Sequence, residues 1–109
     1  MSITGMNHAV LYVRDAHVHK RFYREVLGFE ANIEDCDGKY VFMRAPGSSN
    51  HHDIAFFTVG EGASASLAGH GSVGLYHLAW EVSTLGELAE VREELARQGC
   101  LVGTSDHGV

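Results

Sequence analysis

Apolar and polar residues alternate in two stretches of the chain that closely resemble each other, residues 6–13 and residues 75–82. In each stretch a histidine holds the third position and a valine the last, and the two histidines, His8 and His77, are 69 residues apart. Strict alternation is typical of a half-buried strand, and similarity at a fixed offset indicates a repeated structural unit. We therefore expect two copies of one unit, each opening with a strand that carries a histidine.

A helical pattern follows each of these strands. In the first copy Asp15 is suited to cap the helix and Gly28 to end it. In the second copy Thr84 and Glu87 form a capping-box pattern, and Gly99 ends the helix. The positions expected to be buried are Val18, Phe22, Val26 and Leu27 in the first helix and Leu88, Val91 and Leu95 in the second.

Three further strands are predicted in the first unit. Residues 29–34 and 40–44 have strand character on either side of Asp37 and Gly38, a pair typical of a two-residue type I′ hairpin turn. Residues 52–59 resume strand character after a loop. Residues 1–59 are therefore predicted to form a βαβββ module.

The predicted fold class is α+β, with paired βαβββ modules in a single domain of residues 1–109. Residues 60–74, rich in Gly, Ala and Ser, are expected to connect the modules. The second module, residues 75–109, is expected to be truncated at the C-terminus, because only a helix and a short strand at 101–104 follow its first strand. We expect a mixed, mostly antiparallel sheet curved around a cleft, with the helices outside it. Its exposed edges favour pairing between chains, so a homodimer is predicted.

Composition narrows the possible partners. The formal net charge of −6, with no cluster of Lys or Arg, argues against a nucleic-acid partner. No apolar run approaches the ~18 residues of a membrane span, so no membrane partner is expected. Cys36 and Cys100 have neither zinc-finger nor disulfide-framework spacing. No signal peptide opens the chain, and a cytoplasmic protein is expected.

The two matched histidines are the first candidates for chemistry. Strand alternation puts His8 on one face with Val10 and Tyr12, turned away from the helix. Two similar units would bring His8 and His77 together, and paired imidazoles are a natural metal site. Taken singly, a strand histidine is more often structural. Glu81 lies about 13 Å further along the strand than His77, too far to share one ion, so a carboxylate ligand is expected beyond the last residue.

A second candidate lies at the start of the strand 52–59. Alternation puts His52, Ile54 and Phe56 on one face, which we interpret as an apolar wall with an imidazole at its mouth. His52 could then act as a general acid or base beside an aromatic substrate, or be only a polar residue at a strand entry. Val10 is expected to line the same pocket. No role is expected for the remaining histidines of the helix and connector, His17, His19 and His70.

These motifs together resemble the vicinal oxygen chelate superfamily of glyoxalases, bleomycin-resistance proteins and extradiol dioxygenases, and most of all the extradiol (catechol 2,3-) dioxygenases. The sequence NHAVLYV around His8 resembles the family's first-strand ligand motif, and YREVLGF at 23–29 resembles its helix end. HDIAF and YHLAW place the family's catalytic histidine at His52 and a second metal ligand at His77. The turn DHG resembles a family turn that would bring His107 near the substrate. The family's closing glutamate motif is not in these residues.

The resemblance implies an Fe(II)-dependent extradiol dioxygenase that cleaves a catechol-type aromatic diol with O₂. A glyoxalase-like lyase or isomerase that uses Zn²⁺, Ni²⁺ or Mn²⁺ as a Lewis acid is the alternative within the superfamily. A metal-free protein that binds a small aromatic molecule is a third possibility, since one fold supports unrelated functions. The absent carboxylate favours this third possibility, and the matched histidines argue against it.

Overall fold

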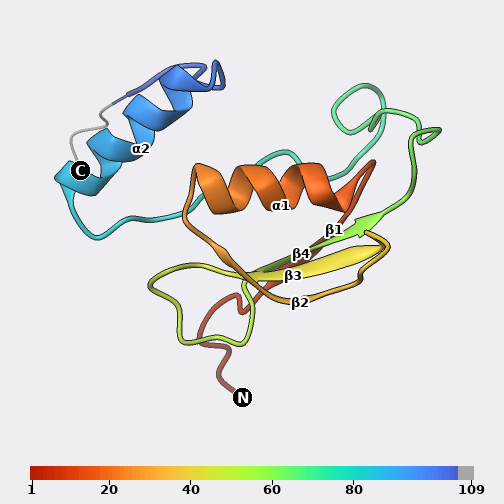
Figure 1. The fold of residues 1–109 in the computed structure, drawn as a ribbon, viewed down its shortest axis with the longest axis horizontal. Helices are drawn as coiled ribbons and strands as arrows, with labels where there is room; N and C mark the ends of the chain where they lie inside the picture. The colour runs from red at the N-terminus through yellow and green to blue at the C-terminus, as the bar shows by residue number, and fades with distance from the viewer. Residues whose placement is uncertain (106–109) are drawn as a thin grey trace.

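The computed structural model describes residues 1–105 and confirms the α+β class, with a mixed four-stranded sheet and two helices in that part of the chain. Figure 1 shows the elements in order. They are β1 (Ala9–Val13), α1 (Ala16–Glu25), β2 (Glu30–Glu34), β3 (Tyr40–Arg44), β4 (Ile54–Thr58) and α2 (Leu85–Arg97). The first unit is therefore the predicted βαβββ module, although β1 and β4 begin later than the alternation suggested. Within residues 1–105, no helix has the length and apolar character needed to cross a membrane.

The four strands lie in the order β1-β4-β3-β2. β1 runs parallel to β4, whereas β3 is antiparallel to both β4 and β2. Ala55 pairs with Val10 on one side and with Phe42 on the other. Residues paired directly across strands share a face, so this register fixes which side chains face the helix and which face the opposite side.

The core lies between the sheet and α1, which covers one face (Figure 1). The side chains of Met43, Ile54 and Phe56 have no exposed surface. The remaining members of this buried cluster are Ala16, Phe29 and Val41. Burying a large apolar side chain stabilises a fold by about 1.5–3 kcal/mol, so this face provides most of the module's apolar stabilisation.

Helix α1 begins as predicted, and its predicted apolar stripe is confirmed in part. The Asp15 carboxylate accepts a hydrogen bond from the backbone N–H two residues on, at 2.9 Å, and so caps the helix. Ala16, Tyr23 and Leu27 contact the core, whereas Val18 is 49% exposed. Leu27, just after the helix, packs against the core as predicted, whereas Val18 does not, and Tyr23, which the predicted stripe left out, turns inward.

The connection between β2 and β3 is longer than the two-residue turn predicted. It spans residues 35–39, and the Asp35 carboxylate accepts hydrogen bonds from the backbone N–H groups of Asp37 and Lys39. A type I′ turn needs positive φ at both central residues, but only Gly38 has it here, at +77°. A Cβ at Gly38 would also lie 2.5 Å from the ring of His17. Gly38 is therefore required by the loop at residues 35–39 and not by a type I′ turn.

The second unit forms its helix but not its predicted strands. Neither residues 75–82 nor residues 101–104 form a strand. A strand needs a neighbour for its backbone hydrogen bonds, and in the first unit β1 finds that neighbour in β4. At the repeat offset of 69 residues, the equivalent of β4 would fall beyond residue 109. The alternating pattern therefore has no strand to pair with in the described chain.

Helix α2 forms from local sequence signals although it is not packed into a core. Thr84 and Glu87 form the predicted capping box, and Gly99, with φ of +72°, follows the helix end. No residue of α2 is buried, and Leu88 is 53% exposed. The prediction of a buried stripe is wrong for this part of the chain, because the surface that the stripe would cover is not formed.

The segment 75–82 packs instead on the first unit. Leu78 contacts the core cluster, and the ring of Trp80 lies edge-on to Phe29 and Tyr23, with ring centroids 5.1 and 6.3 Å apart. Leu78 and Trp80 therefore cover the α1 side of the first unit, where the chain passes on its way to α2 (Figure 1).

Candidate functional site

Aromatic side chains cover the face of the sheet that α1 leaves open. Phe57 of β4 lies 5.6 Å from Tyr40, 5.8 Å from Phe42 and 6.5 Å from Tyr12, measured between ring centroids. The rings come from three adjacent strands, because the register places Tyr12 and Tyr40 opposite Phe57. We call these four residues, Tyr12, Tyr40, Phe42 and Phe57, the aromatic floor. Such a surface suits a flat, apolar ligand.

Two imidazoles lie at one end of the aromatic floor. The ring centroids of His8 and His52 are 4.3 Å apart, and the edge-on contact of His52 with Phe42 is 4.9 Å. β1 and β4 are parallel, so the residues that precede them emerge at the same end of the sheet. This parallel pairing, rather than a contact between the two units, brings the imidazoles together.

The neighbours of His52 favour its neutral form. Partial burial lowers the pKa of His52 below its ordinary value, and positive charge on His8 and His51 would lower it further, whereas Asp53 opposes the shift. Nδ1 of His51 lies 3.0 Å from Nδ1 of His52. The lowered pKa favours the unprotonated imidazole, which can accept a proton.

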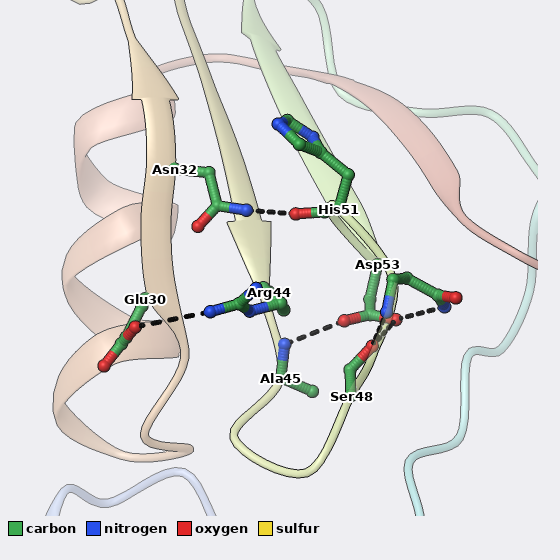
Figure 2. Close-up of polar contacts among 8 residues, drawn as sticks. Glu30, Asn32, Arg44, Ala45, Ser48, His51 and Asp53 are labelled. Carbon is green, nitrogen blue, oxygen red and sulfur yellow. Dashed lines mark hydrogen bonds and ion pairs between the residues drawn. The ribbon is translucent and has the colours of Figure 1, made fainter.

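Asp53 is the buried anchor of this end of the sheet, 7% exposed. Figure 2 shows its carboxylate receiving hydrogen bonds from the backbone N–H of Ala45 and the hydroxyl of Ser48, each at 2.8 Å. The amide of Asn50 donates a third, also at 2.8 Å. Burial alone would raise the pKa of Asp53, but these bonds and nearby His52 outweigh it and lower the pKa below its usual value. The ionised Asp53 carboxylate therefore holds in place the loop that precedes His52.

The structure separates the residues predicted to form one pocket. Val10 lies on the open face and is 51% exposed. Ile54 and Phe56 are fully buried in the core beneath α1, so the prediction that they line the pocket was wrong. His52 does not share their face, because the chain bends at Asp53 and the alternation begins only at Ile54.

The predicted pairing of His8 with His77 is not observed among the described residues. The ring of His77 contacts Tyr76, and that of His8 contacts His52. His77 belongs to the segment that packs on the α1 side through its neighbour Leu78. A ligand role for His77 remains a prediction. His107, the remaining predicted pocket residue, lies outside the described residues.

Sequence reasoning missed most of the aromatic floor. Tyr40 and Phe42 alternate with Val41 and Met43 in β3, which shows that the two sets face opposite sides. Which set is buried depends on the register with β4 and cannot be read from one strand. His19, for which no role was expected, lies with its ring 5.0 Å from that of Phe56, and burial lowers its pKa despite the opposing effect of Asp15.

A hollow of about 550 Å³ lies at the other end of β1, away from the imidazoles. It lies between the ends of β1 and β4 and the start of the connector, and Tyr12 of the aromatic floor lines it. The Arg14 guanidinium donates a hydrogen bond of 2.8 Å to the carbonyl of Ala63 and so holds the connector in place. The floor thus extends from the imidazole pair to this hollow.

The imidazole nitrogens at this end of the aromatic floor are of a type that binds divalent metal ions. Imidazole nitrogens bind Fe²⁺, Zn²⁺ and Ni²⁺, and His8 offers Nε2, to which no residue of 1–105 donates a hydrogen bond. Within those residues the only three His, Cys, Asp or Glu side chains with ligand atoms mutually within 4.8 Å are Asp35, Cys36 and Asp37, in the exposed β2–β3 loop. The described chain therefore supplies part of a ligand set at His8.

The family of the chain follows from comparison with known proteins. A model of the Glyoxalase/Bleomycin resistance protein/Dioxygenase superfamily matches residues 5–108. The chain belongs to this superfamily, whose members are often metal-dependent enzymes. No curated protein gives a significant match.

Solved structures support the same fold. A glyoxylase/bleomycin resistance protein/dioxygenase domain from Frankia sp. EAN1pec is 26% identical, with a TM-score of 0.71, and the match covers 90% of this chain and 71% of that one. A possible glyoxalase from Bacillus cereus is 15% identical, with a TM-score of 0.68 and coverage of 96% and 83%. A lactoylglutathione lyase from Agrobacterium tumefaciens is 23% identical, with a TM-score of 0.55 and coverage of 84% and 69%. The last two likenesses concern the fold alone.

Proposed function

We propose that this chain is a metal-dependent extradiol dioxygenase that opens the ring of a catechol-type diol with O₂. The observation that carries the proposal is the His8–His52 pair at the end of the aromatic floor. An aromatic surface beside a basic imidazole suits a flat substrate with acidic hydroxyl groups. Superfamily membership makes a divalent metal a reasonable cofactor.

In this proposal each group has a separate task. The aromatic floor holds the substrate ring flat on the open face of the sheet, and the exposed side of Val10 adds to the apolar surface. His52, kept neutral by its surroundings, accepts a proton from a substrate hydroxyl. His8, and by prediction His77, would hold Fe²⁺. When bound, that ion supplies the redox chemistry that joins the diol and O₂.

The test is anaerobic loading with Fe²⁺, followed by mono- and bicyclic catechols and air, with the yellow ring-cleavage product measured by absorbance. We expect His8→Ala and His77→Ala to abolish Fe²⁺ binding. His52→Ala should retain the metal and reduce turnover about 10²–10⁴-fold, the usual contribution of general acid–base catalysis.

His70→Ala is the matched control, since His70 is an exposed histidine of the connector. It should change neither metal affinity nor turnover. Failure of every catechol to give product, from a protein that binds Fe²⁺, would contradict the dioxygenase proposal. Equal effects of His52→Ala and His70→Ala on turnover would contradict the role of His52.

A glyoxalase-like lyase is the second candidate, favoured by the fold likeness to the lactoylglutathione lyase and the possible glyoxalase. Such an enzyme would use Zn²⁺ or Ni²⁺ to polarise a carbonyl oxygen. Elemental analysis of protein purified without added metal distinguishes the two: iron supports the dioxygenase, and zinc or nickel the lyase.

A metal-free binder of a small aromatic molecule is the third candidate. It is favoured because, within residues 1–105, no set of three His, Cys, Asp or Glu ligand atoms mutually within 4.8 Å includes His8 and His52. Such a protein would bind no divalent metal at micromolar concentration and would retain its ligand after His8→Ala.

The homodimer predicted from the sequence is tested by sedimentation of the purified wild-type protein.

A further inference from the structure

A chain of side-chain hydrogen bonds links the buried carboxylate of Asp53 to the imidazole of His8. The Asp53 carboxylate accepts from Nδ2 of Asn50 at 2.8 Å. Oδ1 of Asn50 accepts from Nδ2 of Asn7 at 3.2 Å. Oδ1 of Asn7 lies 2.8 Å from Nδ1 of His8. Four residues, Asp53, Asn50, Asn7 and His8, thus form one polar relay.

The direction of every bond in this relay follows from the charge at its start. An ionised carboxylate only accepts hydrogen bonds, so the Asn50 amide must turn its NH₂ group toward Asp53 and its oxygen toward Asn7. That oxygen also only accepts, so Asn7 must turn its NH₂ group toward Asn50. Only the oxygen of Asn7 is then left for His8, and Nδ1 of His8 must be the donor.

The relay also holds in place a segment that has little else to fix it. Residues 1–8 precede β1, form no strand or helix, and are exposed. Besides the side-chain bonds, Nδ2 of Asn50 donates to the backbone carbonyl of Asn7 at 3.2 Å. Asn7 is therefore held at two atoms by a residue 43 positions away.

We propose that Asn7 and Asn50 are positioning residues that hold His8 in its Nδ1–H tautomer, so that Nε2 is its basic, ligating atom. The inference deepens the proposed function, since it specifies the nitrogen of His8 that would bind a metal ion. Histidines that bind metals commonly donate their other N–H to a carbonyl or carboxylate, which fixes the tautomer and the ring orientation. The amide of Asn7 has that role here.

The tautomer is measured by long-range ¹H–¹⁵N NMR of metal-free protein, at a pH where His8 is neutral. In the wild type we expect Nδ1 of His8 to be the protonated nitrogen. In Asn7→Ala, the Nε2–H form, which dominates in free histidine, should become the major one. Asn50→Ala should shift the population in the same direction, but less. Asn7→Asp should retain the wild-type tautomer, because its carboxylate can still accept from Nδ1–H.

Asn32→Ala is the matched control, since the Asn32 amide donates to the carbonyl of His51 and is not part of the relay (Figure 2). It should leave the tautomer of His8 unchanged. A wild-type His8 protonated at Nε2 would overturn the proposal, as would an Asn7→Ala spectrum identical to that of the wild type. Retention of the fold in each variant is checked by the dispersion of the same spectra.

Zinc affinity, measured by titration with Zn²⁺ alone, gives a second reading. Loss of a partner that orients a ligand typically costs 10–100-fold in metal affinity, and we expect a loss of this size in Asn7→Ala but not in Asn7→Asp. The two proposals fail separately. Catalytic failure with the expected tautomers would overturn only the proposed function, whereas catalysis with His8 protonated at Nε2 would overturn only this inference.

Discussion

The two units begin with nearly the same sequence pattern, yet only the first becomes a sheet. Residues 9–13 of the first unit pair with β4 at five positions, whereas residues 75–82 of the second form no strand. Local alternation is present in both. The difference shows that alternation makes a segment able to form a strand, and that a neighbouring strand decides whether it does.

The helices of the two units are alike in their caps but differ in burial. Both are capped by the residues that the sequence indicated, Asp15 for α1 and Thr84 for α2. Ala16 of α1 is buried in the core, while α2 has no buried residue. A helix can thus form from local signals, but its apolar stripe is buried only where a sheet has already formed.

Truncation of one large apolar side chain in each unit should give the largest contrast. Phe56→Ala removes a fully buried ring from the first unit and is expected to cost about 3–5 kcal/mol in the free energy of unfolding. Leu88→Ala changes a side chain of α2 that is 53% exposed and should stay within about 0.5 kcal/mol. Urea unfolding followed by the fluorescence of Trp80 measures both. Equal losses would show that the second unit is packed as tightly as the first.

A change at Asp53 should be the next largest. In Asp53→Asn, the three donors lose an ionised acceptor, which is expected to cost about 1–3 kcal/mol at neutral pH. The pKa of Asp53 is lowered by folding, so its stabilisation is complete above the unfolded-state pKa of about 4 and is lost as the pH falls through the lower folded-state pKa.

The free energy of unfolding as a function of pH tests this assignment. The wild type should lose stability in acid more steeply than Asp53→Asn. Asp37→Asn, in the exposed loop between β2 and β3, is the matched control and should retain the wild-type slope. An unchanged slope in Asp53→Asn would contradict the role of Asp53 as anchor.

The smallest expected effect concerns His19, on the buried side of α1. Burial lowers its pKa below 6.5, and the negative charge of Asp15 partly offsets this. Asp15→Asn keeps a good helix cap but removes the charge, so the pKa of His19 should fall further. In the wild type, the contribution of His19 to the free energy of unfolding is present above pH 6.5. It is lost as the pH falls through the folded-state pKa of His19. NMR titration of the His19 ring is the measurement, and a rise in the pKa would contradict the account.

The sequence predicted the elements of the first unit well because each has strong local signals. Asp15 and Gly28 mark the ends of α1, and the strands of the first unit lie close to the predicted ranges. The family was also evident from the order of its motifs. These features depend on residues close together in the chain.

What could not be predicted depends on contacts between distant residues. Phe57 and Phe42 join the candidate site only because of the register between β3 and β4. His52 turns to the open face because the Asp53 carboxylate bonds to the loop before it, which no period in the sequence records. Whether residues 75–82 form a strand depends on a partner strand, and alternation alone does not reveal whether one is present.

Hydrogen exchange of the backbone amides tests the central claim most directly, that the first unit is a formed sheet and the second is not. The account predicts slow exchange in Tyr40–Arg44 and Ile54–Thr58, the two strands that are paired on both sides, and exchange close to that of an unstructured chain for residues 76–82. Protection of residues 76–82 as strong as that of Ile54–Thr58 would contradict it.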